Sequence, residues 1–460
     1  MENTETAAGN GGAGSRYEVL KSLTLASGLF DLRRDADGRL YIYRKGVRGG
    51  IPNKVPQYTF LHANGVSEIR PIDVETGERI IGRLAAGEHF SSAFLFSENS
   101  DEVSAEFIAA LQKKNRMEEL FTSTGAKFWK HREALENYRA GNGRTVISTH
   151  ISPEGRCNLA CPYCSVTYRQ NKNRLSLETI QDYVEKLLSR GLRAVILTGG
   201  GEPTLYPQIN ELLEYLFSRG LNVAMITNGT NFHKVDWKLI ERLTWTRISV
   251  NVFDGWETRI RLPQPLPENV TLGMSFIYTP QHEANAVDLP AVLTKVKGLA
   301  DNLNARYIRL LPNCLLDQKS LLREHLALSK IIEQLDDKRF FHQGKIHEPP
   351  QAKVCHQSYF RPYLSEEPFP GTDIPGTVFP CDSIVLNQDL EHFNEEFALC
   401  PPGDILGYMD RKIAARFDPG TNCTGCVFTS TVNMLERYVA TGEDRFADFE
   451  HKDIDHVDFV

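Results

Sequence analysis

The stretch GRCNLACPYCSV, residues 155–166, places three cysteines within eight residues. Cys157, Cys161 and Cys164 lie in a predicted loop directly after the strand-like segment TVISTHIS at 145–152. Three thiolates on one loop can bind three irons of a cubane [4Fe-4S] cluster and leave the fourth iron open to an outside ligand, whereas a closed cluster takes four cysteines. A structural zinc site likewise prefers four ligands. The spacing favours a cluster with an open iron over a zinc loop or chance spacing.

The rest of the chain has the composition of an ordinary soluble globular protein, with 460 residues of which 41% are hydrophobic and 24% charged. A net charge of -7 and the lack of a Lys/Arg cluster give no electrostatic reason to expect DNA or RNA as a partner. No apolar stretch approaches the ~20 residues that span a bilayer. Residues 1–16 lack the pattern of a signal peptide and are predicted to be a disordered tail. We therefore expect a cytoplasmic protein with reduced thiols and no membrane partner.

From residue 145 to about residue 337, short apolar segments alternate with amphipathic ones. Six apolar or β-branched runs predict strands that are buried on both faces, which calls for a parallel sheet in an α/β fold. The first intervening helix has Ser176 as a possible N-cap and Gly191 as a C-terminal stop. A closed or partly closed (β/α) barrel and an open doubly wound sheet both fit this order. The predicted strands are 145–152, 194–200, 222–229, 247–252, 271–279 and 307–313, and a last helix covers about 318–337.

The sequence on either side of this core has a different character. Before it, a hairpin is predicted to turn at Asp37-Gly38, and a helix is predicted after residue 104. After residue 340 the chain is rich in Pro, Gly and Cys, which predicts a small domain held by ligands rather than by a large core. The predicted regions are a disordered tail (1–16), an α+β region suited to substrate recognition (17–140), the strand–helix core (141–340), a cysteine-bearing domain (341–440) and a C-terminal tail (441–460).

The cysteine loop resembles the signature CxxxCxΦC of the radical S-adenosylmethionine (radical SAM) superfamily, in which Φ is aromatic. Tyr163 takes the aromatic position, and Asn158-Leu159 matches the common form CNLxCxYC. The resemblance covers about residues 145–315. It implies a partial (β/α)6 TIM-like barrel, a [4Fe-4S] cluster on the three loop cysteines, and S-adenosylmethionine as the second cofactor.

A glycine-rich motif, LTGGGEPTLYP at 197–207, includes the end of the next predicted strand. Read alone, such a loop could bind phosphate, but it lacks the spacing of GxGxxG or GxxxxGK[ST]. The resemblance implies that Gly200, Gly201 and Glu202 bind the amino group of the methionine part of the cofactor. Glycine suits this task because backbone carbonyls can approach a ligand where no Cβ intervenes.

The segment RISVNVFDG at 247–255 resembles the family's ribose-binding strand. Asn251 stands where the family has a serine, and an amide can make the same hydrogen bonds. Phe253 is an extra residue relative to the family pattern, which puts the alignment in doubt. Arg259 or Arg261 is a candidate for contacting the carboxylate of the cofactor, and an ordinary surface arginine is the alternative.

A second group of cysteines resembles the auxiliary-cluster domains called twitch and SPASM. A single thiol, a Pro-Cys pair after a strand-like run and a CxxC pair carry the resemblance, and it implies one further [4Fe-4S] cluster, as in the twitch form. Such a closed cluster would conduct or accept electrons. A structural zinc site is the alternative, and Cys400 could replace one ligand. The implied ligands are Cys355, Cys381, Cys423 and Cys426.

Cys314 follows the sixth predicted strand and has two interpretations: a hydrogen-atom donor, as in radical SAM epimerases, or a buried structural cysteine. The resemblance implies an oxidoreductase-type enzyme that cleaves S-adenosylmethionine reductively to a 5′-deoxyadenosyl radical and abstracts a hydrogen atom from its substrate. The cofactor supplies the chemistry, and the protein supplies positioning. We expect oxidation of a peptide, with flavodoxin or ferredoxin as the electron donor. The alternatives are a sugar or aminocyclitol dehydrogenase, an epimerase and, remotely, a non-catalytic metal-binding protein.

Overall fold

The computed structural model of the chain has two compact units, which we call the first and the second unit. The first comprises Met1–Phe107, Ile277–Lys297 and Pro312–Asp336, and the second comprises Ile108–Phe276, Gly298–Leu311 and Asp337–Val460. The structure describes residues 17–25, 28–45, 53–61, 67–87, 95–97, 105–113, 115–161, 163–166, 171–250, 260, 262, 265–278, 289–333, 335–346, 350, 352–386, 393–412, 422–423 and 425–460. The predicted tail at 1–16 lies outside these residues.

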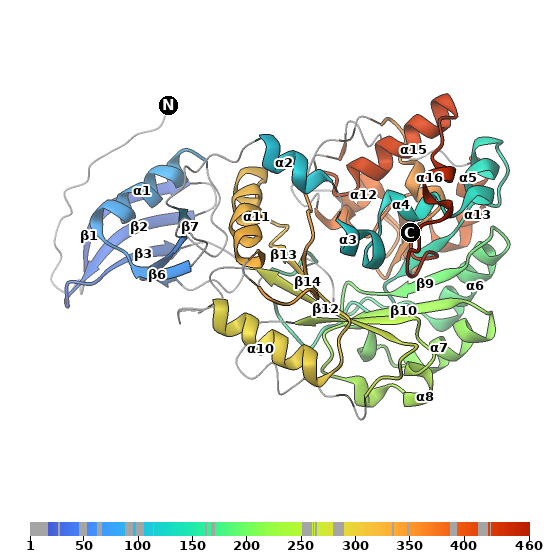
Figure 1. The fold of residues 1–460 in the computed structure, drawn as a ribbon, viewed down its shortest axis with the longest axis horizontal. Helices are drawn as coiled ribbons and strands as arrows, with labels where there is room; N and C mark the ends of the chain where they lie inside the picture. Colours follow the sequence, from blue (N-terminus) through green and yellow to red (C-terminus); the bar gives the residue numbers. More distant parts are fainter. Residues whose placement is uncertain are drawn as a thin grey trace. The chain divides into compact units, whose positions relative to one another are not determined.

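The first unit contains two small sheets and a helix that packs on one of them. Its elements are β1 (Tyr17–Leu25), β2 (Gly28–Asp35), β3 (Leu40–Lys45), β4 (Lys54–Val55), β5 (Gln57–Leu61), β6 (Ser67–Pro71), α1 (Val74–Ala85), β7 (Leu95–Ser97) and α11 (Gln318–Ile332). The sheet orders are β1-β2-β3-β4 and β6-β5-β7. Leu32, Ile42 and Ile80 are fully buried where α1 packs on the first sheet (Figure 1).

The predicted hairpin at Asp37-Gly38 is confirmed. Strands β2 and β3 pair antiparallel, and Gly38 has a φ of +79°, a backbone conformation that glycine adopts without steric cost. The helix predicted after residue 104 is also confirmed as α2 (Ala105–Gln112). Two helices, α2 and α10 (Leu289–Asn302), contain residues of both units.

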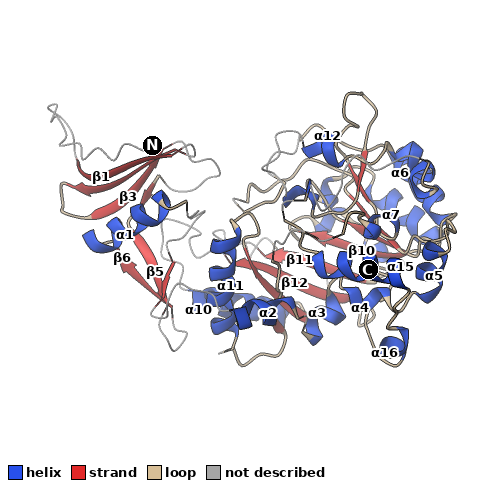
Figure 2. Cartoon of the chain, turned by 90° about the horizontal axis from the view of Figure 1, so that it is seen from above, coloured by secondary structure: helices blue, strands red, loops and turns tan. Residues whose placement is uncertain are grey.

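The second unit is built on a nine-stranded sheet with the order β14-β13-β12-β11-β10-β9-β8-β15-β16. Its strands are β8 (Ser148–Ile151), β9 (Ala194–Leu197), β10 (Asn222–Thr227), β11 (Trp245–Val250), β12 (Thr271–Tyr278), β13 (Tyr307–Pro312), β14 (Phe340–His342), β15 (Tyr363–Ser365) and β16 (Thr377–Phe379). All six predicted strands are present as β8 to β13, and the described pairings among them are parallel. Figure 2 shows β10, β11 and β12 side by side. The expected parallel sheet is therefore confirmed, and a partial barrel stays a prediction.

The helices of the second unit connect the strands and cover the sheet. They are α3 (Arg116–Phe121), α4 (Gly125–Phe128), α5 (Arg132–Arg139), α6 (Leu177–Leu188), α7 (Ile209–Ser218), α8 (Trp237–Ile240), α12 (Phe393–Phe397), α13 (Ile405–Met409), α15 (Thr429–Thr441) and α16 (Phe446–Glu450). Ser176 caps α6 as predicted, because its Oγ accepts the Thr179 N–H at 3.1 Å. Gly191 follows α6 with a φ of +101°. Residues of β9 are buried on both faces, which explains its continuous apolar run.

The C-terminal residues, predicted as a tail, pack into the second unit. Phe459 is 2% exposed and Val460 is fully buried. The Phe459 ring lies 5.4 Å from the Trp245 ring in an edge-on contact and shares an apolar cluster with Ala194 and Ala224. Ala194 and Trp245 are the first residues of β9 and β11, so Phe459 packs near the amino ends of these strands.

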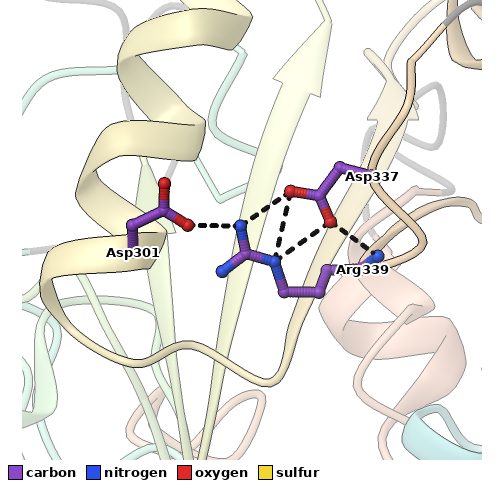
Figure 3. Close-up of polar contacts among 3 residues, drawn as sticks. All are labelled: Asp301, Asp337 and Arg339. Carbon is purple, nitrogen blue, oxygen red and sulfur yellow. Dashed lines mark hydrogen bonds and ion pairs between the residues drawn. The ribbon is translucent and has the colours of Figure 1, made fainter.

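An arginine ties the start of β14 to the last turn of α10. The Arg339 guanidinium lies between two carboxylates, donating to Asp337 at 2.7–3.2 Å and to Asp301 at 2.5 Å (Figure 3). These two carboxylates raise the pKa of Arg339 above its usual range, the hydrogen bond with Asp337 being the largest cause. The cluster therefore fixes the outer end of the parallel sheet.

Candidate functional site: three loops at the carboxyl end of the sheet

The cysteine loop follows β8 directly, as predicted. Cys157, Cys161 and Cys164 form no disulfide, and all three residues are partly exposed. The Leu159 N–H donates to the Cys157 Sγ at 3.4 Å, and the Asn228 Nδ2 lies 4.0 Å from the same sulfur. The sulfur of Cys157 is thus held between two N–H donors, which favour a thiolate.

A buried carboxylate supports the base of this loop. Glu154 is 1% exposed, and its side chain accepts the Arg174 Nε–H at 2.8 Å and the Arg156 backbone N–H at 3.1 Å. Its backbone carbonyl accepts the Gly201 N–H at 2.8 Å. Glu154 therefore joins the cysteine loop to the glycine loop that follows β9.

The glycine loop packs against the cysteine loop through backbone atoms. The Glu202 N–H donates to the Arg156 carbonyl at 2.9 Å, and the Gly200 N–H donates to the Ser152 Oγ at 2.7 Å. A Cβ on Gly201 would lie 2.6 Å from the Glu154 carbonyl oxygen, and one on Gly200 would lie 2.8 Å from the carboxyl carbon of Glu366. Real Cβ contacts do not reach such distances, so the close approach of the two loops requires glycine at position 201, where the neighbouring atoms belong to the backbone.

The Glu202 side chain stabilises the glycine loop through hydrogen bonds. It is 3% exposed and accepts four hydrogen bonds: the Thr204 N–H at 3.1 Å, the Thr204 Oγ1–H at 2.7 Å, the Thr227 Oγ1–H at 2.5 Å and the Asn228 N–H at 2.8 Å. Burial raises its pKa, against the lowering effect of these donors. Because the carboxylate already accepts four hydrogen bonds, we expect Glu202 to contact a ligand through its backbone.

Asn228, which the sequence motifs do not include, connects the loop after β10 to the cysteine loop and the glycine loop. Its Nδ2–H donates to the Asn158 Oδ1 at 2.8 Å, and the Asn158 Nδ2–H donates to the Thr230 Oγ1 at 2.8 Å. In the sequence, the polar segment TNGT at 227–230, at the end of a strand, is the feature that could have identified Asn228 as a site residue. The loops after β8, β9 and β10 therefore meet at one end of the sheet, where parallel α/β folds place their sites.

These three loops fit the expected cofactors. The three thiols can each bind a different iron, and the backbone of the glycine loop is hydrogen-bonded directly to the cysteine loop. Within the described residues, no three His, Cys, Asp or Glu side chains surround a single metal position. A cubane cluster does not need such an arrangement, because each thiolate binds a different iron. Burial, and then the nearby Cys161 and Cys164 thiols, raise the pKa of Tyr163, so this ring lies beside two of the sulfurs.

The structure gives less information on the other predicted site residues. Asn251, Arg259 and Arg261 lie outside the described residues. Cys314 lies in the turn after β13, with its Sγ 3.7 Å from the Pro312 carbonyl oxygen. It is not among the described residues that line the cavity of the second unit.

That cavity has a volume of about 230 Å³ and is lined by side chains of β8, β9, β10, β11, β13 and β15. Arg361, 1% exposed, pairs with the Asp382 carboxylate and donates from Nε to the His150 Nδ1 at 3.3 Å. Burial lowers the pKa of His150 to about 3. Burial opposes ionisation of Asp382, yet Arg361 and its other cationic neighbours hold the pKa of this carboxyl below its usual range. Among the described residues, five cationic side chains and one carboxylate line the cavity: Lys127, Arg247, Arg309, Lys345, Arg361 and Asp382.

The second group of cysteines comes together beside this cavity. Burial is the largest cause that raises the pKa of the Cys355 thiol, followed by the nearby thiols of Cys426 and Cys423. Burial likewise raises the pKa of Cys381, followed by the thiol of Cys355, the Asp382 carboxylate and the thiol of Cys426. Each of the four is therefore a close neighbour of at least one other.

Cys400 has different surroundings. It is 1% exposed and forms an antiparallel bridge with Val378. Burial raises its pKa to about 12, and the neighbour that adds to this effect is Asp404 rather than a thiol. The other four cysteines fit a common cluster better than any set that includes Cys400.

The described helices include none long and apolar enough to cross a membrane.

Two curated proteins match part of this chain. Over 81 residues the chain is 40% identical to 7-carboxy-7-deazaguanine synthase of Haemophilus influenzae, covering 18% of this chain and 36% of that protein. Over 72 residues it is 38% identical to GTP 3',8-cyclase of Synechococcus sp., covering 16% of this chain and 21% of that protein. The chain thus spans about a third and a fifth of the length of these curated relatives.

The crystal structure of Streptococcus suis SuiB bound to precursor peptide SuiA aligns with a TM-score of 0.37 and 12% identity, over 73% of this chain and 84% of that one. Residues 151–269 match the family model of the Radical SAM superfamily. This segment contains the cysteine loop and the glycine loop. Residues 151–269 thus form a radical SAM domain, whose family uses a [4Fe-4S] cluster and S-adenosylmethionine.

Proposed function

We propose that this chain is an oxidising radical SAM enzyme whose substrate binds in the cavity of the second unit. Cys157, Cys161 and Cys164 would hold the first cluster, and backbone groups of Gly200, Gly201 and Glu202 would bind the methionine amino group. When bound, this pair of cofactors supplies a 5′-deoxyadenosyl radical that removes a hydrogen atom from the substrate. The hydrogen bonds that join the three loops support the proposal, because they fix the position of the cysteine loop relative to the glycine loop.

The cavity is a suitable place for the substrate because it adjoins these loops. Thr198 and Gly199, at the start of the glycine loop, and Ser165 and Val166, at the end of the cysteine loop, belong to its lining. Side chains of the strands, of α3 and α4 and of the C-terminal segments contribute to the rest of the wall. Surrounding a reactive substrate with protein atoms excludes water and positions the reacting C–H bond.

The observation that carries the oxidative outcome is the grouping of Cys355, Cys381, Cys423 and Cys426 behind the cavity wall. Asp382 and Phe428 line the cavity, and they lie one and two residues beyond Cys381 and Cys426. We assign these four cysteines to an auxiliary [4Fe-4S] cluster, which supplies an electron acceptor when bound. A product two electrons more oxidised than the substrate is then expected.

A peptide is our first candidate substrate. The first unit is a separate α+β region, and its strand β1 is an edge strand of nine residues with mostly exposed side chains. Such an edge can pair with an extended peptide backbone. A small molecule is the second candidate, because a cavity of about 230 Å³ is smaller than most drug-sized ligand pockets.

Metal analysis tests the auxiliary cluster. After anaerobic reconstitution, the variant with alanine at Cys157, Cys161 and Cys164 should retain about four irons per chain, as one closed cluster requires. Zinc in place of iron in this variant would make the C-terminal cysteines a structural site and remove the basis for an oxidised product.

A further inference from the structure

We propose that the cavity of the second unit binds an anionic group of the substrate, a carboxylate or a phosphate, and that Arg247 is its principal ligand. This inference rests on the proposed function, since it names the substrate class for the same site. An anionic group has two sources, an acidic side chain of a peptide or a free small acid, and both share this chemistry.

The cavity has an excess of positive charge. Its lining includes five cations and one carboxylate, and Asp382 is already paired with Arg361. Burial is the largest cause that lowers the pKa of Lys127 to about 7, and Arg247 and Arg361 contribute to this lowering against the raising effects of Asp455 and Asp458. A buried cation is costly unless it is paired, so an incoming anion would be stabilised here.

Arg247 is the cation with a free bonding position. Its Nε is buried and has no hydrogen-bond acceptor. Within the part of the chain that the structure describes, its ring contact is with Trp245, 5.6 Å from the guanidinium carbon, and no carboxylate pairs with it. A guanidinium with an unused donor can bind a carboxylate or phosphate through two parallel hydrogen bonds.

Arg309 reaches the same cavity from a strand two places away. Arg247 is on β11 and Arg309 is on β13, with β12 between them. The residue of β12 opposite Arg247 is Gly273, and the Tyr307 ring, which also lines the cavity, packs directly over it. Arg309 donates to the neutral groups of Ser275, at 2.8 and 3.1 Å, and Gln343, at 2.9 Å. These bonds hold Arg309 in place at the cavity.

The test is calorimetric titration of the reconstituted full chain with inorganic phosphate and, separately, with acetate, with ionic strength held constant by sodium chloride. We expect saturable binding of at least one anion by the wild type and at least about tenfold weaker binding by Arg247→Gln, as loss of a charge-assisted hydrogen bond predicts. Arg247→Lys should fall between them, because an ammonium lacks the two-pronged geometry.

Arg242→Gln is the matched control, because Arg242 is an exposed arginine stacked 4.3 Å from the Phe217 ring and outside the cavity lining. It should bind both anions as the wild type does. Circular dichroism and cluster absorbance identify variants that fail to fold. If Arg247→Gln is among them, Arg309→Gln takes its place. Absence of anion binding by the wild type, or equal binding by the wild type and the cavity variant, would overturn the inference.

Two further ligands distinguish the sources of the anion. A blocked peptide with one glutamate is compared with its glutamine version and with free glutarate. Arg247-dependent binding of the glutamate peptide in preference to glutarate would support a peptide substrate, and the reverse preference would support a small acid. Binding is measured without turnover. Anion binding that persists while 5′-deoxyadenosine is not released would therefore contradict the proposed function and leave this inference standing.

Discussion

Replacing Gly201 with alanine tests whether backbone contact between the loops holds the site together. The new Cβ would lie 2.6 Å from the Glu154 carbonyl oxygen, so the glycine loop must move away from the cysteine loop by several tenths of an ångström. That shift strains the hydrogen bonds from the Gly201 and Glu202 N–H groups, now 2.8 and 2.9 Å long. Each is worth about 1 kcal/mol net, and overpacking adds about 1–3 kcal/mol. We expect a loss of roughly 3–5 kcal/mol in the free energy of unfolding.

The matched control is the same substitution in open space. A Cβ on Gly298, within α10, meets no atom within 4 Å outside its own helix and neighbours. Alanine there should stabilise the protein by about 0.5–1 kcal/mol through helix propensity. Urea unfolding followed by circular dichroism compares the two variants, and equilibrium dialysis measures their affinity for S-adenosylmethionine. Unchanged stability and unchanged cofactor affinity in Gly201→Ala would refute the reasoning.

Four other variants have equally definite expectations. Burial raises the pKa of Glu366 to about 7 from an ordinary 4.5, so the folded state binds the extra proton and stability should fall by up to about 3 kcal/mol as pH rises from 4.5 to 7. Glu366→Gln should remove this decline in urea midpoints, and parallel profiles would contradict the expectation. Arg339→Ala breaks the cluster of Figure 3 and should cost about 1–2 kcal/mol in the same assay while iron content is retained. Cys355→Ala should lose about four irons in metal analysis, whereas Cys400→Ala should lose none; equal losses would reassign the ligands.

The sequence predicted those elements whose signals are local. The six parallel strands are apolar runs of β-branched and aliphatic residues, and Ser176 stands directly before an amphipathic segment, so both could be recognised from neighbouring residues alone. The positions of the cysteine and glycine loops, directly after strands, could be predicted for the same reason. Strand β15 could not be predicted, because it has three residues and pairs with β8, more than two hundred positions away, through Tyr363 opposite His150 and Leu364 opposite Ile151.

Side-chain roles depended on contacts that a linear pattern does not contain. The motif marked Glu202 as a ligand residue, but its carboxylate is engaged by Thr204, Thr227 and Asn228. The cavity arginines did leave a signal. Arg247 and Arg309 interrupt runs that otherwise read as doubly buried strands, where charged residues are rare. Such interruptions point to a polar interior.

The central claim is that Cys157, Cys161 and Cys164 hold a cluster that activates S-adenosylmethionine. The most direct measurement is the release of 5′-deoxyadenosine from the anaerobically reconstituted chain in the presence of dithionite and S-adenosylmethionine. The wild type should release it, and the variant with alanine at all three positions should release none while keeping the iron of its auxiliary site. Equal release from the two proteins would contradict the account.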